Sequence, residues 1–186
     1  EDPLYPFQRS GVAWLLRNKR AILADDMGLG KTAQALSAAR RLFRHGVITQ
    51  CLVIAPGTLL ANWEREAKFW APELVTAIVR PTLLEREREW AAATKDVNII
   101  LTSYEQIRNE IPAFKDNPPQ LIIADEAHRL RKNSAQATKG FRKIHSQRFW
   151  ALSGTPIENS AEDIATLLSL LFPKKYSPRN KDDKLA

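Results

Sequence analysis

Short runs of apolar residues recur along the chain, without strict alternation between apolar and polar positions. Strands with this composition are usually buried on both faces, as in a parallel sheet that helices cover. The pattern therefore predicts a β-strand at each run. We place these strands at residues 21–24, 51–55, 74–79, 97–101, 120–124 and 148–153.

Between the runs, apolar residues recur every three to four positions, which is the spacing of one helix face. Residues 32–46 carry such a stripe, and Gly46 is expected to end that helix. The stripe consists of Ala35, Leu36, Ala39, Leu42 and Phe43. A second helix is predicted over residues 58–70, with Thr58 as candidate N-cap. Its shared face consists of Leu59, Trp63, Ala67 and Trp70. Further helices are predicted over about residues 83–93, 135–144 and 161–171.

The alternation of strands and helices with short connections predicts a single α/β domain. Its expected form is a doubly wound, mostly parallel sheet with helices on both faces and right-handed crossovers. In such sheets, ligands bind beyond the carboxyl ends of the strands. Functional side chains are therefore expected directly after the apolar runs.

Composition limits the class of protein. The chain has 186 residues, of which 44% are hydrophobic and 26% charged, as in ordinary globular domains. No apolar run approaches the ~20 residues of a membrane span, and the first residues lack the features of a signal peptide. We therefore expect an intracellular protein with no membrane partner. The single cysteine, Cys51, lies in an apolar run and is expected to be a buried core residue.

The net charge of +7 raises the question of a nucleic-acid partner. From residue 173 onward, five Lys or Arg residues against two Asp residues contribute +3, which leaves +4 for the rest of the chain. That excess is weak evidence for a polyanionic partner, because solvated basic surfaces are the commoner explanation.

The sequence DDMGLGKT, residues 25–32, joins the first predicted strand to the first predicted helix. Gly28 and Gly30 allow backbone N–H groups to curve around phosphate. Lys31 can then reach the β- and γ-phosphates, and the Thr32 hydroxyl can bind Mg²⁺. The usual motif has glycine where this chain has Asp25, at the mouth of the loop, where a side chain can turn away from phosphate. The alternative is a glycine turn that only caps a helix.

The sequence LIIADEAH, residues 121–128, places an acidic pair at the end of a predicted strand. Asp125 is expected to hold Mg²⁺, directly or through water, and Glu126 to polarise the attacking water. DEAH alone could be a helix-capping turn, but its place downstream of GLGKT favours a nucleotide site. His128 could be a surface residue or a zinc ligand. With three histidines and one cysteine in the chain, we favour a role linking the nucleotide site to the next loop.

Together, DDMGLGKT, DEAH and LSGTP resemble the ATPase motor of superfamily 2 helicases, and specifically the SWI/SNF-type DNA translocases. The phosphate loop of that family reads D-E-M-G-L-G-K-T, so Asp25 matches and Asp26 replaces a glutamate. The resemblance covers about residues 4–173 and implies the first RecA-like lobe of a P-loop NTPase motor. Residues 1–173 would form this lobe, and residues 174–186 a polar tail or linker toward a second lobe.

The resemblance also implies the roles of individual residues. LYPFQRSGVAWL resembles the family's opening segment, so Gln8 would read adenine. The nucleotide contacts implied are Gln8, Asp26, Met27, Gly28, Leu29, Gly30, Lys31, Thr32 and Ala33. Lys31, Asp125 and Glu126 would be catalytic, with Mg²⁺ held by Thr32 and Asp125.

The segments IAPGTLLANWEREAKFW and LTSYE resemble motifs Ia and Ib, whose small polar groups contact nucleic-acid phosphate and sugar without reading sequence. The contacts implied are Gly57, Thr58, Asn62, Thr102, Ser103 and Tyr104. Trp63 could stack on a base, but its place on an apolar helical stripe favours the core. LSGTPIENSAEDIATLLSLLFP resembles motif III. The residues implied to couple ATP to the nucleic-acid rim are His128, Ser153 and Thr155; read alone, SGTP could form only a tight turn.

The resemblance implies an ATP-dependent translocase or remodeller of double-stranded DNA that uses ATP and Mg²⁺ and contacts the DNA backbone. A second lobe would supply an arginine finger, worth about 10³–10⁵ in rate, so the fragment alone is expected to bind nucleotide weakly and to hydrolyse it poorly. The alternatives are a strand-separating DNA or RNA helicase and a non-hydrolysing, nucleotide-gated binding module. A protein partner or nucleoprotein substrate stays open. A bacterial cytoplasm is favoured over a nucleus, because no eukaryotic-style charged tails are visible.

Overall fold

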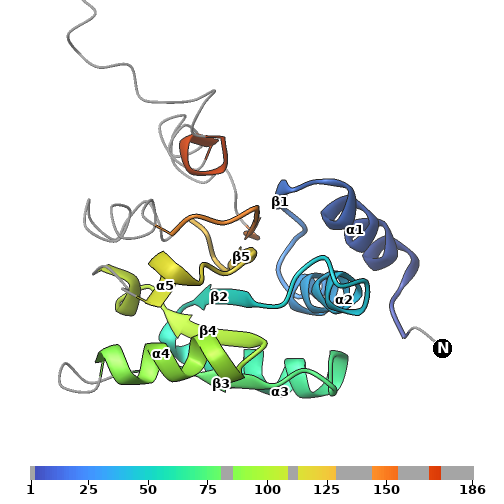
Figure 1. The fold of residues 1–186 in the computed structure, drawn as a ribbon. Helices are drawn as coiled ribbons and strands as arrows, with labels where there is room; N and C mark the ends of the chain where they lie inside the picture. Colours follow the sequence, from blue (N-terminus) through green and yellow to red (C-terminus); the bar gives the residue numbers. More distant parts are fainter. Residues whose placement is uncertain (1–2, 81–85, 109–112, 129–143, 155–167, 173–186) are drawn as a thin grey trace, which may run out of the picture.

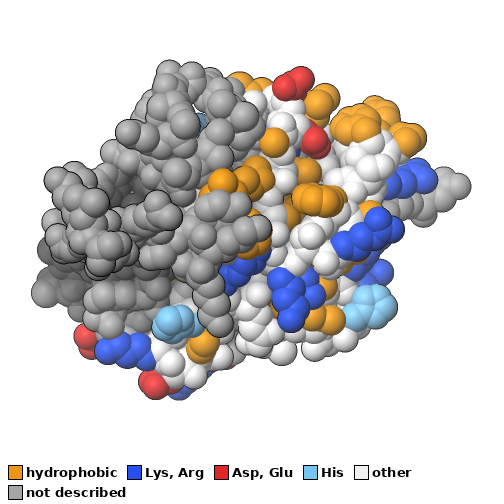
Figure 2. Space-filling model, turned by 90° about the horizontal axis from the view of Figure 1, so that it is seen from above, with side chains coloured by type: hydrophobic (Ala, Val, Ile, Leu, Met, Phe, Trp, Pro, Cys, Tyr) orange, Lys and Arg blue, Asp and Glu red, His pale blue; other side chains and the backbone are white. Residues whose placement is uncertain are grey.

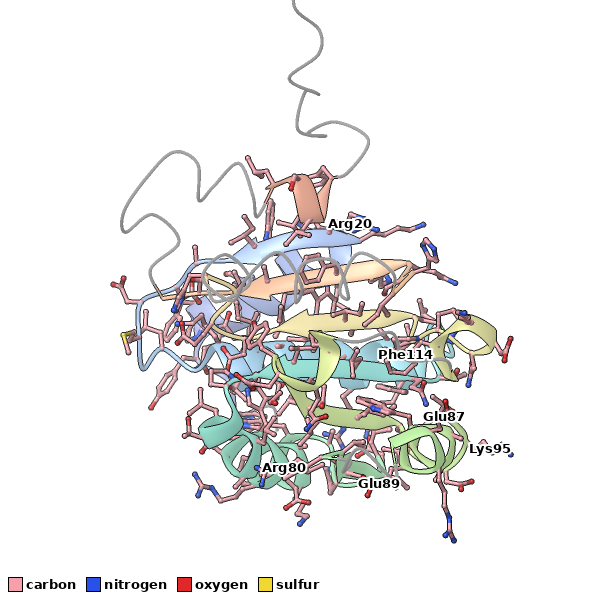
Figure 3. All side chains as sticks on the ribbon, turned by 90° about the vertical axis from the view of Figure 1, so that its left-hand side faces the viewer. Arg20, Arg80, Glu87, Glu89, Lys95 and Phe114 are labelled. Carbon is pink, nitrogen blue, oxygen red and sulfur yellow. The ribbon has the colours of Figure 1, made fainter. Side chains whose placement is uncertain are left out.

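The computed structural model describes residues 3–80, 86–108, 113–128, 144–154 and 168–172. Within them, a parallel six-stranded sheet has the order β1-β6-β5-β2-β4-β3, which Figure 3 shows from β1 at the top. The predicted α/β class and parallel sheet are thereby confirmed. The strands are β1 (Arg20–Leu23), β2 (Cys51–Ala55), β3 (Thr76–Ile78), β4 (Ile99–Ser103), β5 (Leu121–Ala124) and β6 (Arg148–Leu152).

Helices cover both faces of this sheet (Figure 1). On one face lie α1 (Pro6–Arg17), α2 (Lys31–Arg44) and α3 (Leu60–Trp70), with α2 between its neighbours. On the other lie α4 (Arg86–Asp96) and α5 (Ala113–Asp116), where Trp90 meets Phe114 edge to face with ring centroids 5.3 Å apart (Figure 3). The 3₁₀ turns η1 (Gly57–Leu59) and η2 (Gln106–Arg108) follow β2 and β4.

Strand β2 shows why the strands carry no polar alternation. Cys51 and Val53 pack into the core under α1–α3, whereas Leu52 and Ile54 pack into the core on the opposite face. All five residues of β2 are buried. Burial raises the pKa of the Cys51 thiol, which keeps it uncharged, as expected of a core cysteine.

Helix α2 ends where the sequence predicts. Gly46 has φ 64°, its N–H donates to the Phe43 carbonyl at 2.9 Å, and the N–H of Val47 donates to the Leu42 carbonyl at 2.9 Å. Burial extends beyond the predicted stripe to Gln34 and Ser37, because helices flank α2 on both sides.

The N-cap prediction at Thr58 is wrong. Pro56 opens a 3₁₀ turn that Leu59 closes by donating its N–H to the Pro56 carbonyl at 2.8 Å. Helix α3 therefore begins at Leu60, with Leu59 at the N-cap and no side-chain cap. Of the predicted face, Trp63 and Ala67 are buried and Trp70 is half-buried, whereas Leu59 lies before the helix and the buried Leu60 was not predicted.

Some predicted elements fall partly or wholly outside the described residues. Of the helix expected over residues 161–171, the structure describes helical residues 168–171. The helix expected over residues 135–144 lies outside the described part, apart from its last residue. The short segments η2 and α5 were not predicted, because neither is long enough to show an apolar period. Among the described helices, none is both long and apolar enough to cross a membrane.

Candidate functional site

The loop between β1 and α2 is shaped by two glycines in left-handed conformations. Gly28 has φ 83° and Gly30 has φ 73°, both unfavourable for residues with a side chain. A Cβ at Gly30 would lie 2.5 Å from Nε2 of Gln8, whereas a Cβ at Gly28 would meet nothing within 4 Å. Gly30 thus allows close packing against α1, and Gly28 lies at an open position.

Lys31 is held by the loop that precedes it. Its Nζ donates to the Asp25 carbonyl at 2.8 Å and to the Asp26 carbonyl at 3.0 Å. The Asp25 carboxylate accepts a hydrogen bond from Nε2 of Gln34 in α2, at 2.8 Å. The carboxylate that replaces the usual glycine is therefore bound by the helix, a contact that was not predicted.

Gln8 joins α1 to the same loop. Its Nε2 donates to the Leu29 carbonyl at 3.2 Å, and its Oε1 accepts from the N–H of Tyr5 at 3.0 Å. The residue is 8% exposed. In this structure both ends of the amide bind protein, so Gln8 braces the loop. Its role in reading adenine stays a prediction.

Asp125, directly after β5, forms hydrogen bonds with four neighbouring residues. Its Oδ2 accepts from the Trp63 indole N–H at 2.8 Å, and its Oδ1 from the N–H of Glu126 at 2.9 Å. Its carbonyl accepts from the Tyr104 hydroxyl at 2.6 Å, and its N–H donates to the Ile54 carbonyl at 2.8 Å. Burial raises the pKa of Asp125, against the lowering effect of the Trp63 hydrogen bond.

Glu126 has a strained backbone. Its φ of 49° is the only positive φ of a residue other than glycine among those the structure describes. Such a conformation costs on the order of 1 kcal/mol and is typical of functional sites. Its Oε2 lies 3.2 Å from Nδ1 of His128. His128 therefore adjoins the acidic pair, consistent with its predicted linking role.

The phosphate loop and the acidic pair open into one cavity of about 390 Å³. The spatial convergence of Lys31, Asp125 and Glu126, predicted from sequence, is thus present. Thr32 contributes as well. The complete lining is Met27, Gly28, Gly30, Lys31, Thr32, Ala33, Leu59, Asn62, Glu66, Asp125 and Glu126.

The predicted coupling segment lies against this loop. A Cβ on Gly154 would come within 2.7 Å of Cγ of Met27 and 3.4 Å of Nζ of Lys31. The preceding Ser153 is 1% exposed, and its N–H donates to the Leu23 carbonyl at 3.1 Å. Thr155 lies outside the described residues.

The cavity offers the oxygen ligands that Mg²⁺ prefers. Thr32, which carries a hydroxyl, and Asp125, which carries a carboxylate, both line it. In the described part of the chain, no group of three or more His, Cys, Asp or Glu residues could hold a metal ion. Mg²⁺ fits such a site, because it usually binds through one or two protein ligands and completes its octahedron with water and phosphate.

The predicted nucleic-acid contacts separate into exposed and buried groups. Gly57 and Thr58 are exposed on η1. Asn62 is half-buried and lines the cavity beside the phosphate loop. Arg80, which sequence reasoning missed, is exposed and donates from Nη2 to the Gly57 carbonyl at 3.2 Å (Figure 3).

The nucleic-acid contacts expected at the end of β4 stay a prediction, and all three side chains are buried in this structure. Thr102 and Tyr104 are fully buried, and Ser103 is 8% exposed. The Thr102 hydroxyl donates to the Val79 carbonyl at 3.0 Å. Because β4 lies inside the sheet and core residues cover both of its faces, the hydroxyls of Thr102 and Tyr104 donate to main-chain carbonyls of Val79 and Asp125.

On the described part of the face in Figure 2, several Lys and Arg side chains lie near one another, with hydrophobic and uncharged side chains between them.

Sequence reasoning also missed Leu59 and Glu66 in the cavity wall and the hydrogen bonds of Trp63 and Tyr104. A buried indole requires an acceptor, which was an available signal for Trp63. The identity of that acceptor depends on tertiary structure.

The family model described as SNF2-related domain matches residues 7–184. Chromodomain-helicase-DNA-binding protein 6 of Homo sapiens is 30% identical over 192 residues, which cover 94% of this chain and 7% of that protein. Chromodomain-helicase-DNA-binding protein 7 of Gallus gallus is 31% identical over 192 residues, which cover 94% of this chain and 6% of that protein. The chain therefore spans under a tenth of the length of these relatives.

Solved structures agree with the family match. The Sulfolobus solfataricus SWI2/SNF2 ATPase core in complex with dsDNA superposes with a TM-score of 0.79 at 31% identity, covering 92% of this chain and 36% of that one. The Sulfolobus solfataricus SWI2/SNF2 ATPase core domain gives a TM-score of 0.78 at 32% identity, covering 91% and 35%.

Proposed function

Because the chain belongs to the family of SNF2-related domains, we propose that it is the first motor lobe of an ATP-dependent translocase or remodeller of double-stranded DNA. The observation that carries this proposal is the single cavity in which Lys31, Thr32, Asp125 and Glu126 converge. The chain spans only part of its relatives, so the activity of the whole protein is inferred from this site.

The nucleotide step begins with Lys31. On binding ATP, its ammonium leaves the carbonyls of Asp25 and Asp26 and pairs with the β- and γ-phosphates. Thr32 and Asp125 would hold Mg²⁺, which would supply charge stabilisation to the phosphate oxygens. The backbone N–H groups around Gly28 and Gly30, together with the N-terminus of α2, favour the same anion.

Glu126 is proposed to orient and polarise the attacking water as general base. Its neighbour His128 stands beside the carboxylate at 3.2 Å and can transmit a change in the site to the following loop. Gly154, packed against Met27 and Lys31, supports a coupling role for the segment that contains Ser153 and Thr155.

A second lobe is proposed to complete the site. It would supply the arginine finger, so this chain alone binds nucleotide weakly and turns it over slowly. Closure of the two lobes on Mg-ATP and reopening after hydrolysis would move the motor along one strand of the duplex. Residues 1–173 are proposed as the lobe, and residues 174–186 as the connection.

Duplex DNA is proposed to contact the exposed rim formed by Gly57, Thr58 and Arg80. A structural relative at 31% identity is an ATPase core in complex with dsDNA, which supports this partner. Contacts of this kind go to phosphate and sugar, so binding should be independent of sequence and weaken as salt rises. A protein-bound duplex, in a bacterial cytoplasm or a nucleus, is included in the proposal.

The test is the ATPase rate of the intact protein without nucleic acid and with single strands, duplex DNA or RNA. We expect stimulation by duplex DNA that is lost in Lys31→Ala and Glu126→Gln. Stimulation by RNA alone would favour a strand-separating RNA helicase. Nucleotide binding without turnover under any condition would favour a nucleotide-gated binding module.

A further inference from the structure

Two side chains from distant segments hold Asp125. Trp63, 62 positions earlier in the chain, comes from α3 and binds the carboxylate. Tyr104, 21 positions earlier, follows β4 and binds the main-chain carbonyl. Both are 0% exposed, and Asp125 is 7% exposed. These contacts therefore form inside the protein, where water does not compete for them.

The bond to Trp63 determines how the carboxylate is oriented. Oδ1 receives the N–H of the adjacent Glu126, and Oδ2 receives the indole N–H of Trp63. Each oxygen keeps a further lone pair for another partner. A buried carboxylate needs donors and a buried indole needs an acceptor, so losing either partner leaves the other without its match.

Trp63 also connects two parts of the candidate site. Helix α3 directly follows η1, whose Gly57 and Thr58 are exposed. The same helix contributes Asn62 and Glu66 to the cavity wall. A displacement of α3 therefore moves the exposed turn, the cavity wall and the donor to Asp125 together.

We propose that Trp63 is a positioning residue for the metal-binding carboxylate of Asp125 and thereby links the exposed turn η1 to the metal site. The inference rests on the proposed function, since it takes Asp125 as a Mg²⁺ ligand. Trp63 itself contacts neither nucleotide nor metal in this account. It acts through the orientation of one carboxylate.

The test compares Trp63→Phe with Trp150→Phe in the intact protein. Trp150 is an apt control because it is also 0% exposed and its Nε1 also donates a hydrogen bond, to the Asn18 carbonyl at 3.1 Å, but Asn18, unlike Asp125, does not line the cavity. The measurement is the dissociation constant of a fluorescent ADP analogue with Mg²⁺ and with EDTA. The dissociation constant in EDTA divided by the dissociation constant with Mg²⁺ reports the contribution of the metal.

We expect Trp63→Phe to reduce this ratio about tenfold, since a hydrogen bond to a charged group is lost. Affinity in EDTA should stay near that of the wild type, and Trp150→Phe should keep the wild-type ratio. A purely structural role for Trp63 would change both affinities equally or neither, and either result overturns the inference.

A second variant at position 63 and the response of the wild-type protein to Mg²⁺ complete the test. If Trp63→Phe does not fold, 3-benzothienylalanine placed at position 63 preserves the ring shape and removes only the N–H. The same loss of the metal-dependent ratio is expected, and a wild-type ratio in this variant overturns the inference. A wild-type protein whose nucleotide affinity does not respond to Mg²⁺ would overturn the proposed function, and this inference with it.

Discussion

Lys31 donates to two main-chain carbonyls of its own loop, which is a state that nucleotide binding must replace. Because phosphate offers a formal negative charge where the carbonyls offer only dipoles, the exchange favours the nucleotide. The lysine is thus prepared for phosphate without being required for folding.

We therefore predict that Lys31→Ala lowers the affinity for ADP at least about tenfold but changes the free energy of unfolding by less than about 1 kcal/mol. Fluorescent ADP titration and thermal melting measure the two quantities. Lys68→Ala serves as the control, since Lys68 forms a surface pair with Glu64 at 3.3 Å. A large loss of stability with unchanged ADP affinity would contradict this interpretation of Lys31.

The left-handed backbone of Glu126 gives a second prediction at the residue scale. Glycine adopts φ 49° without the penalty paid by residues with a Cβ, so Glu126→Gly should be more stable than Glu126→Ala by about 1 kcal/mol. Denaturant unfolding of the two variants makes the comparison. At positions with negative φ, an alanine variant is usually more stable than the glycine variant. A Glu126→Ala protein as stable as Glu126→Gly, or more stable, would therefore mean that position 126 is not strained.

Residue-level prediction succeeded where local sequence determines geometry. Gly28, Gly30 and Lys31 follow from the constraints of a phosphate loop, and Asp125 from its place after a strand. The roles of Trp63 and Tyr104 could not be predicted, since their partner lies far away in the sequence and is met only after the sheet forms.

Between elements, Glu73 joins α2 to the segment that precedes β3. Its Oε1 accepts from Nε of Arg40 at 2.7 Å and from Nε of Arg44 at 3.2 Å. The hydrogen bond from Arg40 is the largest cause that lowers the pKa of Glu73 from 4.5 to about 2. Because the pKa of Glu73 is lowered, its ion pairs with the two arginines stabilise the fold fully above about pH 4.5. This contribution to the free energy of unfolding is lost as pH falls toward about 2.

We predict that Glu73→Gln lowers the thermal midpoint at pH 7 and that the difference from wild type shrinks at pH 3. The Glu73 side chain is 39% exposed, so solvent screening limits the effect to under about 1 kcal/mol. Glu64→Gln is the matched control, because the ion pair of Glu64 with Lys68 lies within one helix. A Glu73→Gln difference that grows on acidification would contradict the assignment.

At the element scale, apolar runs located the strands to within about two residues, because buried strands must be apolar on both faces. The start of α3 was misplaced, since a 3₁₀ turn after Pro56 precedes it. Thr58 is a good N-cap by residue type, but the turn places it before the helix and leaves the cap to Leu59.

The whole molecule is a sheet whose carboxyl edge gathers residues from several strand ends. Order β1-β6-β5-β2-β4-β3 places the ends of β1, β5 and β6 next to one another, which is why the phosphate loop, Asp125 and Gly154 meet. The alternating elements predicted a parallel sheet covered by helices, but not the order of its strands. The sequence could not show which hydroxyls face solvent, because that depends on the helices and side chains that pack on both faces of the sheet.

At this scale we predict that duplex DNA binding by the intact protein is independent of sequence and falls steeply with salt, since phosphate contacts release counterions. Arg80→Ala should weaken binding about equally for all sequences and reduce the salt slope by about 1. Fluorescence anisotropy at several salt concentrations measures both. An effect confined to one sequence would show that Arg80 contacts bases instead.

The most direct test of the account is a crystal structure of this chain with Mg²⁺ and a non-hydrolysable ATP analogue. We expect the β- and γ-phosphates within hydrogen-bonding distance of Lys31, the metal bound by Thr32 and Asp125, and Glu126 facing the γ-phosphate. Phosphates bound elsewhere on the molecule, or a metal that Asp125 does not hold directly or through water, would contradict the central claim that these residues serve one triphosphate.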